Sequence, residues 1–309
     1  MRTSGNGSAG RQGRGRTALR SATLPLALVL TTACQTNAAD GPSPAEASFT
    51  VRYDRPTGPD ADDAAFVRER RLPEEAVRHV TALVRLNPPV VMTVRSCDGE
   101  GPSYNPQTRE VEICYDEISE TRGLYQDAGR GLSDDALSAV LLESLFHESA
   151  HAVIDVLDLA VRGKEEDFAD QFAALMLLRQ GAEGEERLLD VAETWRLSAI
   201  TYENEDDGQA DEHSTDHRRA VDHLCYLYGA APANHADVIG TDALPAGRAR
   251  GCAGEWKRAQ AAWMNALGRH AEGDDASAAR AAGGLHESGV PGRVQRRPMR
   301  LAKERSVPG

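Results

Sequence analysis

The chain has 309 residues, enough for one large or two small domains, and it carries a formal net charge of −13. Five arginines and no acidic residue fall within residues 1–34, so the negative charge belongs to the rest of the chain. A body this acidic is repelled by nucleic acids and by anionic membrane surfaces, which argues against both as partners.

The N-terminus has the pattern of an export signal. An arginine- and glycine-rich start precedes the apolar run 24–30, which is too short to span a bilayer. Thr31-Thr32-Ala33-Cys34 then resembles a bacterial lipoprotein processing site, although Thr31 stands where leucine is usual. We expect a signal peptide over 1–33 and a lipid on Cys34, which would hold the protein on the outer face of the membrane. The alternative is a freely secreted protein that is cleaved near Ala33.

Small, polar and proline-containing residues over 34–48 predict a linker, and one domain is expected over 49–270. Its first predicted elements are a strand over 49–53, where apolar and polar residues alternate, and a helix over 73–86 that begins near Pro73. At the other end, residues 271–309 hold few large apolar groups, so a disordered tail is predicted.

Two segments rich in β-branched residues, 90–95 and 110–115, are the clearest predicted strands. The turn signal Asn105-Pro106-Gln107-Thr108 lies between them and predicts an antiparallel hairpin. The edge of such a hairpin could pair with an extended peptide, or the hairpin could serve the core alone.

Four cysteines remain after Cys34, and in an exported chain an even number indicates two disulfides. Three pairings are possible. We favour Cys97–Cys114, which flank the predicted hairpin, and Cys225–Cys252, which lie near two predicted helices at residues 214–228 and 255–269. A four-cysteine zinc site is the competing interpretation, but no Cys-x-x-Cys spacing supports it.

The predicted helix over 134–159 carries the most informative motif of the chain. Ser133 is its expected N-cap, and a broad apolar surface indicates that the helix is buried. Within it lies His147-Glu148-x-x-His151. Residues four apart share one face of a helix, so both imidazoles can bind one zinc ion while Glu148 faces a water on that ion. Two hydrogen-bonded core histidines are the alternative.

A second helix that begins near residue 164 can complete such a site. Glu166 and Asp170 lie one turn apart on it, so Glu166 can supply a third ligand and Asp170 can hold a ligating imidazole by its other nitrogen. The simpler interpretation, a solvated acidic helix start, suits Glu165 and Asp167 better than Asp170, which is flanked by apolar residues.

A third helix is predicted over 186–200, followed by an acidic loop over 203–212 that is interpreted as solvated. Its clustered carboxylates could instead bind calcium, although their spacing does not fit an EF-hand. His213 ends this loop, and Ser214 is the expected cap of the helix that runs to Tyr228. His213 and Arg219 could both reach a developing oxyanion, although Arg219 could instead pair with acidic neighbours.

The motif His147-Glu148-x-x-His151 followed by Glu166-x-x-x-Asp170 resembles the gluzincin arrangement, in which a glutamate on a second helix completes the zinc site. Together with the cysteine positions and segments such as Asp211-Glu212-His213-Ser214, the chain looks like a bacterial family of exported proteins assigned as metallopeptidases of unknown substrate. The resemblance covers residues 50–268. It implies a mainly helical α+β zincin-like fold with a small antiparallel sheet packed on the active-site helix.

The resemblance also implies one zinc ion on His147, His151 and Glu166, with Glu148 as catalytic base and a peptide or protein as substrate. The spacing of His213 and Arg219 resembles a histidine–arginine pair of some gluzincins. A non-catalytic zinc-binding envelope protein is the alternative function, although a structural site normally has four protein ligands. A helical domain without metal is a third possibility.

Overall fold

The computed structural model describes residues 48–202 and 214–271. All of these residues belong to one unit of the chain, 42–309. The predicted signal peptide, the lipidation site Cys34, nearly all of the linker, the acidic loop with His213, and the tail beyond residue 271 lie outside the described residues.

Four short strands form one mixed sheet with the order β1-β2-β4-β3. The strands are β1 (Phe49–Tyr53), β2 (Val90–Arg95), β3 (Ser103–Asn105) and β4 (Glu110–Cys114). β1 is parallel to β2, with Phe49 opposite Val90, and β2 is parallel to β4, with Val91 opposite Glu110. Only β3 runs antiparallel to its neighbour β4, with Ser103 opposite Glu112.

The predicted hairpin between residues 90–95 and 110–115 is therefore wrong. The turn around Asn105 exists, since its side-chain Oδ1 accepts hydrogen bonds from the backbone of Gln107 and Thr108. It joins β4 to the three-residue strand β3, which occupies the sheet edge, and not to β2. β2 and β4 can then lie side by side in parallel because the intervening chain returns before β4 begins.

The helices in chain order are α1 (Ala61–Arg70), α2 (Leu72–Leu83), α3 (Glu117–Asp127), α4 (Asp134–Val156), α5 (Glu165–Leu178), α6 (Ala182–Tyr202), α7 (Asp216–Ala230) and α8 (Ala246–Ala271). A short 3₁₀ helix, η1, spans Ala236–Val238. The expected mainly helical α+β fold is confirmed. Helices α1 and α3 lie in segments for which no helix was predicted, and α8 begins nine residues before its predicted start at Glu255.

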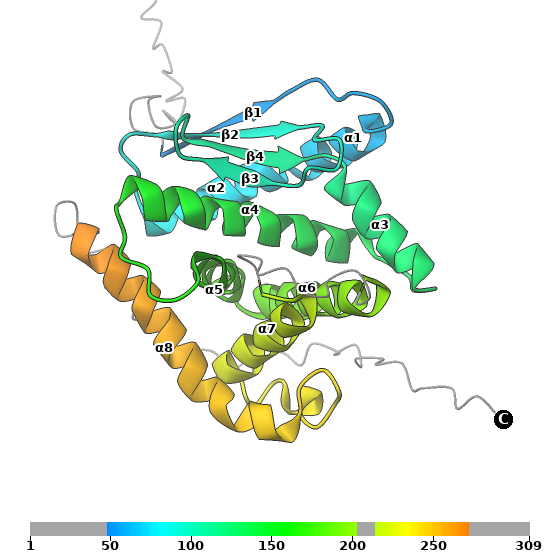
Figure 1. The fold of residues 1–309 in the computed structure, drawn as a ribbon, viewed down its shortest axis with the longest axis vertical. Coiled ribbons are helices and arrows are strands. Elements are labelled where there is room, and N and C mark those ends of the chain that lie inside the picture. Colours follow the sequence, from blue (N-terminus) through cyan, green and yellow to red (C-terminus); the bar gives the residue numbers. More distant parts are fainter. Residues whose placement is uncertain (1–47, 203–213, 272–309) are drawn as a thin grey trace, which may run out of the picture. The chain divides into compact units, whose positions relative to one another are not determined.

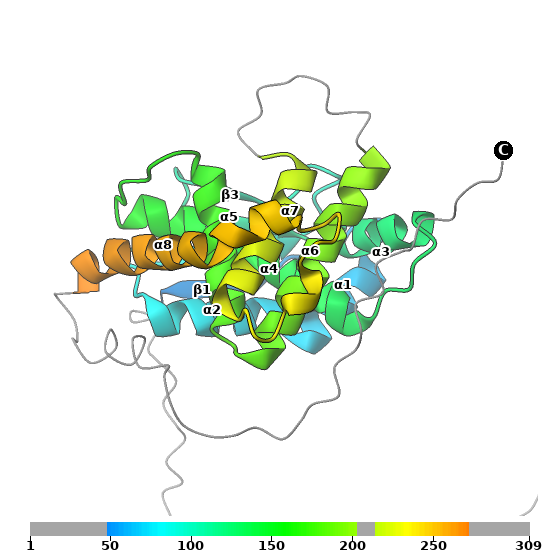
Figure 2. The ribbon, with the colours of Figure 1, turned by 90° about the horizontal axis from the view of Figure 1, so that it is seen from below.

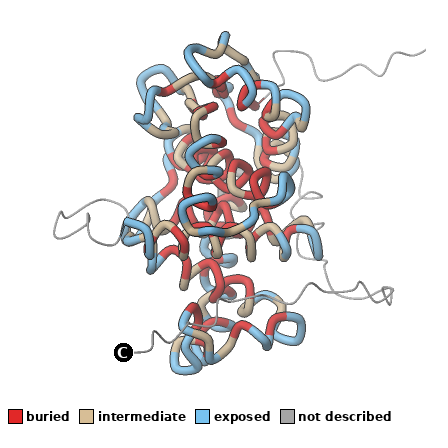
Figure 3. Tube along the Cα trace, turned by 90° about the vertical axis from the view of Figure 1, so that its right-hand side faces the viewer, coloured by how far each residue is buried: buried red, intermediate tan, exposed pale blue. Residues whose placement is uncertain are grey.

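Helix α4 is the centre of the fold. Figure 1 shows it running along the sheet on one side, with α5, α6 and α7 on the other side and α8 crossing diagonally. The view from below places α7 and α8 on the face away from the sheet (Figure 2). Most of the 23 residues of α4 are buried, including Phe146 and Leu145, as expected for a helix covered on both sides. The buried residues gather in the interior of the domain (Figure 3).

Two helix starts were predicted from capping residues. Ser133 is the N-cap of α4, because its hydroxyl accepts a hydrogen bond from the Ala136 amide. For α7 the cap is Thr215, which accepts from the Arg218 amide, and not Ser214. The Ser214 hydroxyl instead donates to the Asp167 carboxylate at the start of α5 and so joins α7 to α5.

Both expected disulfides are present. Cys97–Cys114 closes the end of the sheet where β2 and β4 lead into loops, and Cys225–Cys252 joins α7 to α8. With all four cysteines in disulfides, the alternative four-cysteine zinc site is excluded. Two disulfides are consistent with an extracellular domain. Among the described residues, no helix combines the length and the apolar character needed to cross a membrane.

Candidate metal centre

The two histidines and the glutamate of the motif lie on the buried part of α4. His147 is 5 % exposed and Glu148 is 7 % exposed, whereas His151 is partly exposed. Residues 147 and 151 are separated by one helical turn, and their ring centroids lie 5.0 Å apart. The helix therefore presents both imidazoles in the same direction.

Helix α5 packs against α4 and brings three carboxylates to these imidazoles. Glu165 and Glu166 lie in its first turn, where negative charge also complements the helix dipole, and Asp170 follows one turn later. The aromatic stack of Phe168 on Trp263, with centroids 4.1 Å apart, fixes α5 against α8 from the opposite side. The start of α5 is thus held in position over the histidines.

Three ligand atoms converge between the two helices. Nε2 of His147 lies 3.2 Å from Nε2 of His151, and Oε2 of Glu166 lies 3.0 Å and 3.4 Å from these two nitrogens. A tetrahedral ion with bonds of about 2.0–2.1 Å separates its ligand atoms by roughly 3.3 Å. The observed triangle has the dimensions of one face of such a tetrahedron.

The hydrogen bond made by Nδ1 of each ring explains why the two Nε2 atoms and the Glu166 carboxylate can bind a cation. Nδ1 of His147 donates to Oδ1 of Asp170, and Nδ1 of His151 donates to Oε1 of Glu165, both over 2.9 Å. Carboxylates only accept hydrogen bonds, so both Nδ1 atoms carry the ring proton. In neutral rings the two Nε2 lone pairs then face the Glu166 carboxylate, so a cation has to lie between them, either a proton on a ring nitrogen or a metal ion.

The electrostatics of this cluster favour positive charge. Burial alone lowers the pKa of His147, but the hydrogen bonds with Asp170 and Glu166 outweigh it and raise the pKa to about 10. The pKa of His151 is raised in the same way, where Glu166 and Glu165 overcome the effect of burial. These residues fit a metal ion, and two imidazoles with a carboxylate form a donor set that zinc accepts.

A second group of potential ligands, formed by Glu143, His147 and Asp170, already has a cation of its own. The Arg219 guanidinium donates to Asp170 through Nε at 2.9 Å and through a terminal nitrogen at 2.5 Å, and it lies 3.6 Å from Glu143. It also lies 3.7 Å from the centroid of the Trp195 ring, a cation–π contact. The cation that this group attracts is therefore Arg219.

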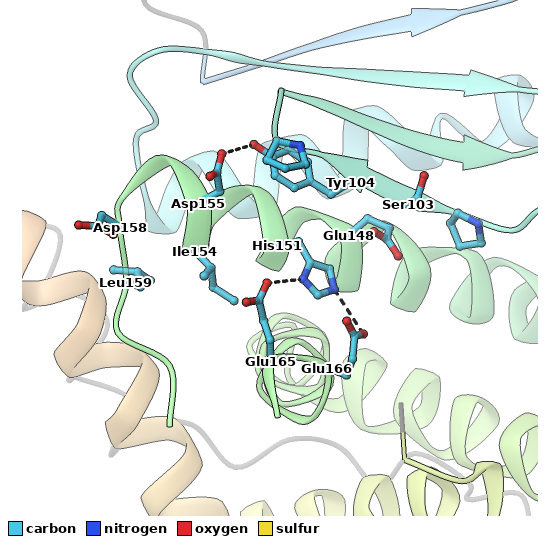
Figure 4. Close-up of a pocket in the computed structure, with 12 residues that line it drawn as sticks. Ser103, Tyr104, Glu148, His151, Ile154, Asp155, Asp158, Leu159, Glu165 and Glu166 are labelled. Atoms are coloured by element: carbon cyan, nitrogen blue, oxygen red, sulfur yellow. Dashed lines mark hydrogen bonds and ion pairs between the residues drawn. The ribbon is translucent and has the colours of Figure 1, made fainter. Parts of the chain in front are cut away.

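Glu148 faces an open cavity next to the candidate ligands. In the described part of the chain its carboxylate makes no hydrogen bond, and burial raises its pKa. The cavity has a volume of about 500 Å³ and is lined by Glu148, His151 and Glu166 on one side and by the edge strand β3 on the other. Figure 4 shows His151 between Glu165 and Glu166, with Glu148 one turn away near Ser103.

The family comparison agrees with this geometry. Residues 53–267, more than half of the chain, match the model of a family of unknown function, DUF4344, described as "Putative metallopeptidase". The chain belongs to this family. Comparison with curated proteins gives no match, and comparison with solved structures gives none. The matched region contains all of the candidate ligands and both disulfides.

In this member of the family, the structure brings together most of the site residues predicted from the sequence. His147, His151 and Glu166 share one cluster, Asp170 lies behind His147, and Glu148 lines the cavity. Arg219 is buried against Asp170 and is not among the residues that line the cavity. This is the alternative foreseen for Arg219, an ion pair with acidic neighbours.

Several residues around the centre were not singled out from the sequence. Glu165, interpreted as solvated, binds His151, and its position next to Glu166 was an available signal. Glu143 precedes His147 by one helical turn and lies 3.5 Å from Nε2 of the fully buried His223. His223 in turn follows Arg219 by one turn and donates from Nδ1 to its backbone oxygen. Glu143 and His147 are four residues apart, as are Arg219 and His223, so this helical spacing was an available signal for both pairs.

Proposed function

We propose that the protein is a zinc-dependent peptidase of the gluzincin type. His147, His151 and Glu166 would hold the ion, and Glu148 would be the catalytic base. The observation that carries the proposal is the convergence of three lone-pair donors beside a buried carboxylate that makes no hydrogen bond in the described structure. A purely structural metal site has no use for that carboxylate, which argues against a non-catalytic envelope protein.

Zinc is the ion that suits these ligands best. Two imidazoles and one carboxylate, with no thiolate available, match the three-ligand pattern of catalytic zinc sites. The described residues offer no fourth side chain to this cluster. A bound zinc ion would lower the pKa of a water molecule and polarise a carbonyl group of the substrate.

Glu148 would carry out the proton transfers of the reaction. The Glu148 carboxylate takes a proton from the attacking water and later delivers it to the nitrogen of the leaving amine. Because burial raises the pKa of Glu148, the carboxylate is a stronger base than an exposed glutamate. It lines the cavity in which a peptide would bind.

Asp170 and Arg219 would act as positioning residues. Asp170 fixes the orientation and the tautomer of His147, and Arg219 holds Asp170 ionised beneath the histidine, since it keeps the pKa of this carboxyl far below its usual range. We retain His213 as the candidate for stabilising the oxyanion, as its sequence position suggested.

The substrate would lie between α4 and the edge strand β3. Within the described sheet, β3 pairs with β4 on one side only, so its other edge is available to an extended peptide. Ser103 and Tyr104 of β3 line the cavity opposite the motif helix. Such pairing would place a backbone carbonyl of the peptide near Glu148.

The N-terminal sequence and the disulfides support a location outside the cytoplasm. We propose a single peptidase domain over 49–270, exported from the cell and held by a lipid on Cys34 or freely secreted. The two disulfides support an oxidising environment.

The decisive experiment replaces Glu148 with glutamine, which keeps the shape of the side chain and removes its basicity. Wild type and Glu148→Gln protein, both loaded with zinc, are incubated with a broad peptide library, and the products are identified by mass spectrometry. We expect cleavage by the wild type and a loss of turnover of at least about a hundredfold in the variant, with zinc content unchanged.

Equal cleavage by the two proteins would contradict the assignment of Glu148. A matched control is Glu186→Gln on helix α6, whose glutamate does not line the cavity and belongs to no candidate metal cluster. This control should cleave like the wild type.

A further inference from the structure

The cavity extends well beyond the candidate metal ligands. Past His151, its wall continues along the last turn of α4 and into the following loop, through Ile154, Asp155, Asp158 and Leu159. Figure 4 shows these side chains on the far side of His151 from Glu148, with Glu165 between them and Glu166. A substrate bound at the metal centre would therefore place a side chain in this extension.

The extension combines an apolar floor with an acidic rim. Ile154 and Leu159 are each 7 % exposed and form the floor. Asp155, Asp158 and Glu165 are exposed carboxylates at its opening. No lysine or arginine is among the residues that line the cavity in the described structure.

The rim carboxylates differ in whether they already accept a hydrogen bond within the protein. Asp155 accepts a hydrogen bond of 2.7 Å from the Tyr104 hydroxyl, and Glu165 accepts one from His151. Asp158 makes no side-chain hydrogen bond or ion pair among the described residues. Its backbone has a φ of 49°, in the left-handed region, within the turn that follows α4.

A second observation shows that the cavity is shaped for a ligand. Glu148 is nine-tenths buried and faces the same cavity, and no side chain or backbone group of the described chain bonds to its carboxylate. Buried carboxylates normally have hydrogen-bond partners, so this partner has to enter from the cavity. The acidic rim lines the same cavity as this carboxylate.

We propose that this extension receives the side chain of a lysine or arginine residue of the peptide substrate, next to the bond that is cleaved. The apolar floor contacts the aliphatic stem, and the rim carboxylates contact the cationic end. A bare metal cation would gain nothing from the apolar floor, and an apolar side chain would leave the carboxylates without a counter-charge. The inference rests on the proposed function, because it requires a peptide at the metal centre.

The test uses three labelled peptides that are identical except at one central residue, which is lysine, norleucine or glutamate in otherwise neutral flanks. Norleucine has the same stem as lysine without the charge. Binding is measured by fluorescence anisotropy to the zinc-loaded full-length Glu148→Gln protein, and cleavage of the same peptides is measured with the wild type. The lysine peptide should bind at least about tenfold more tightly than the norleucine peptide, and the preference should fall with added salt.

The location of the preference is tested by Asp158→Asn in the same background. Asparagine tolerates a positive φ, so the turn is preserved while the charge is removed. The matched control is Asp98→Asn, because Asp98 is also exposed and also has a left-handed φ, of 55°, but does not line the cavity. We expect the preference for lysine to fall about threefold in the first variant and to stay unchanged in the second.

Each outcome has one meaning. Equal binding of the lysine and norleucine peptides, no binding of any peptide, or the same preference in both aspartate variants would overturn the inference. A clear lysine preference that depends on Asp158, together with no cleavage by wild-type protein, would support the binding site and contradict the peptidase function.

Discussion

Nδ1 of His147 lies 2.9 Å from Oδ1 of Asp170, and both side chains are buried. The same carboxylate accepts two hydrogen bonds from Arg219, so one acidic group connects the candidate ligand on α4 to a cation on α7. The orientation of His147 thus depends on residues that do not touch the cavity.

Asp170→Asn should weaken zinc binding by about 10- to 100-fold, because the substitution removes the charged acceptor that fixes the ring of His147. The dissociation constant is measured by competition with a chromophoric chelator. Asp167→Asn is the control, since Asp167 lies on the same helix but bonds to Ser214. If the two variants bind zinc equally well, Asp170 does not position the ligand.

Arg219→Gln should lower the free energy of unfolding by about 3–5 kcal/mol, because it leaves the buried Asp170 without its counter-charge. Urea denaturation measures the effect. The adjacent Arg218 provides a matched control: its side chain is 62 % exposed and its ion pairs are long, so Arg218→Gln should cost about 0–1 kcal/mol.

The same variant separates two roles for Arg219. A positioning residue changes stability and zinc affinity together, whereas a residue that contacts the oxyanion changes kcat alone. An Arg219→Gln protein of unchanged stability with a much reduced kcat would contradict a positioning role for Arg219.

Glu117 on α3 predicts a pH dependence of stability. Its Oε2 is fully enclosed and unpaired in the described structure, and burial raises its pKa to about 8, while Ser144 bonds to the other oxygen. The unfolded chain ionises this group near its ordinary pKa of 4.5, so its contribution to stability is lost as the pH rises from about 4.5 to 8.

Glu117→Gln should remove this loss of stability at high pH. Compared with wild type, the variant should gain a few kcal/mol of unfolding free energy at pH 8 relative to pH 5, since one pKa unit corresponds to about 1.4 kcal/mol. Urea unfolding at both pH values measures the difference. Parallel pH profiles of the two proteins would show that the pKa of this carboxyl group is not raised by folding.

Gly229 permits the close contact of α7 with α8. A Cβ atom at this position would lie 2.5 Å from the backbone oxygen of Cys252. Gly229→Ala should therefore destabilise the protein by about 1–3 kcal/mol, as for other overpacked contacts. Gly251→Ala on α8, where a Cβ meets nothing within 4 Å, should instead stabilise by about 0.5–1 kcal/mol. Thermal unfolding that ranks the two variants in the opposite order would contradict a close approach of the two helices at Gly229.

The long helices were predictable because their apolar periodicity and caps are local. Ser133 and the apolar surface of α4 gave its start and its burial, and the histidine spacing placed both imidazoles on one face. The pairing of the sheet was not predictable in the same way. β3 has only three residues, too few to show alternation, so the segment between β2 and β4 had the pattern of a simple hairpin loop.

The residues that position the metal ligands were also only partly predictable, because some of their contacts are not local in sequence. Glu166 and Asp170 could be expected from their spacing along α5, but the partner of Asp170 lies 49 residues further on, in α7. Local sequence does not show which helix packs behind α5, so the sequence left two roles for Arg219, at an oxyanion or in an ion pair with acidic neighbours. The contact with Trp195 is equally non-local, since it requires α6 and α7 to lie side by side.

The metal centre itself is tested most simply by the zinc content of purified protein after dialysis, measured by mass spectrometry on wild type and on Glu166→Ala. We expect one zinc ion per chain in the wild type and a large loss in the variant, because two imidazoles alone hold the ion weakly. Wild-type protein without zinc, or equal zinc in both proteins, would contradict the metal centre formed by His147, His151 and Glu166.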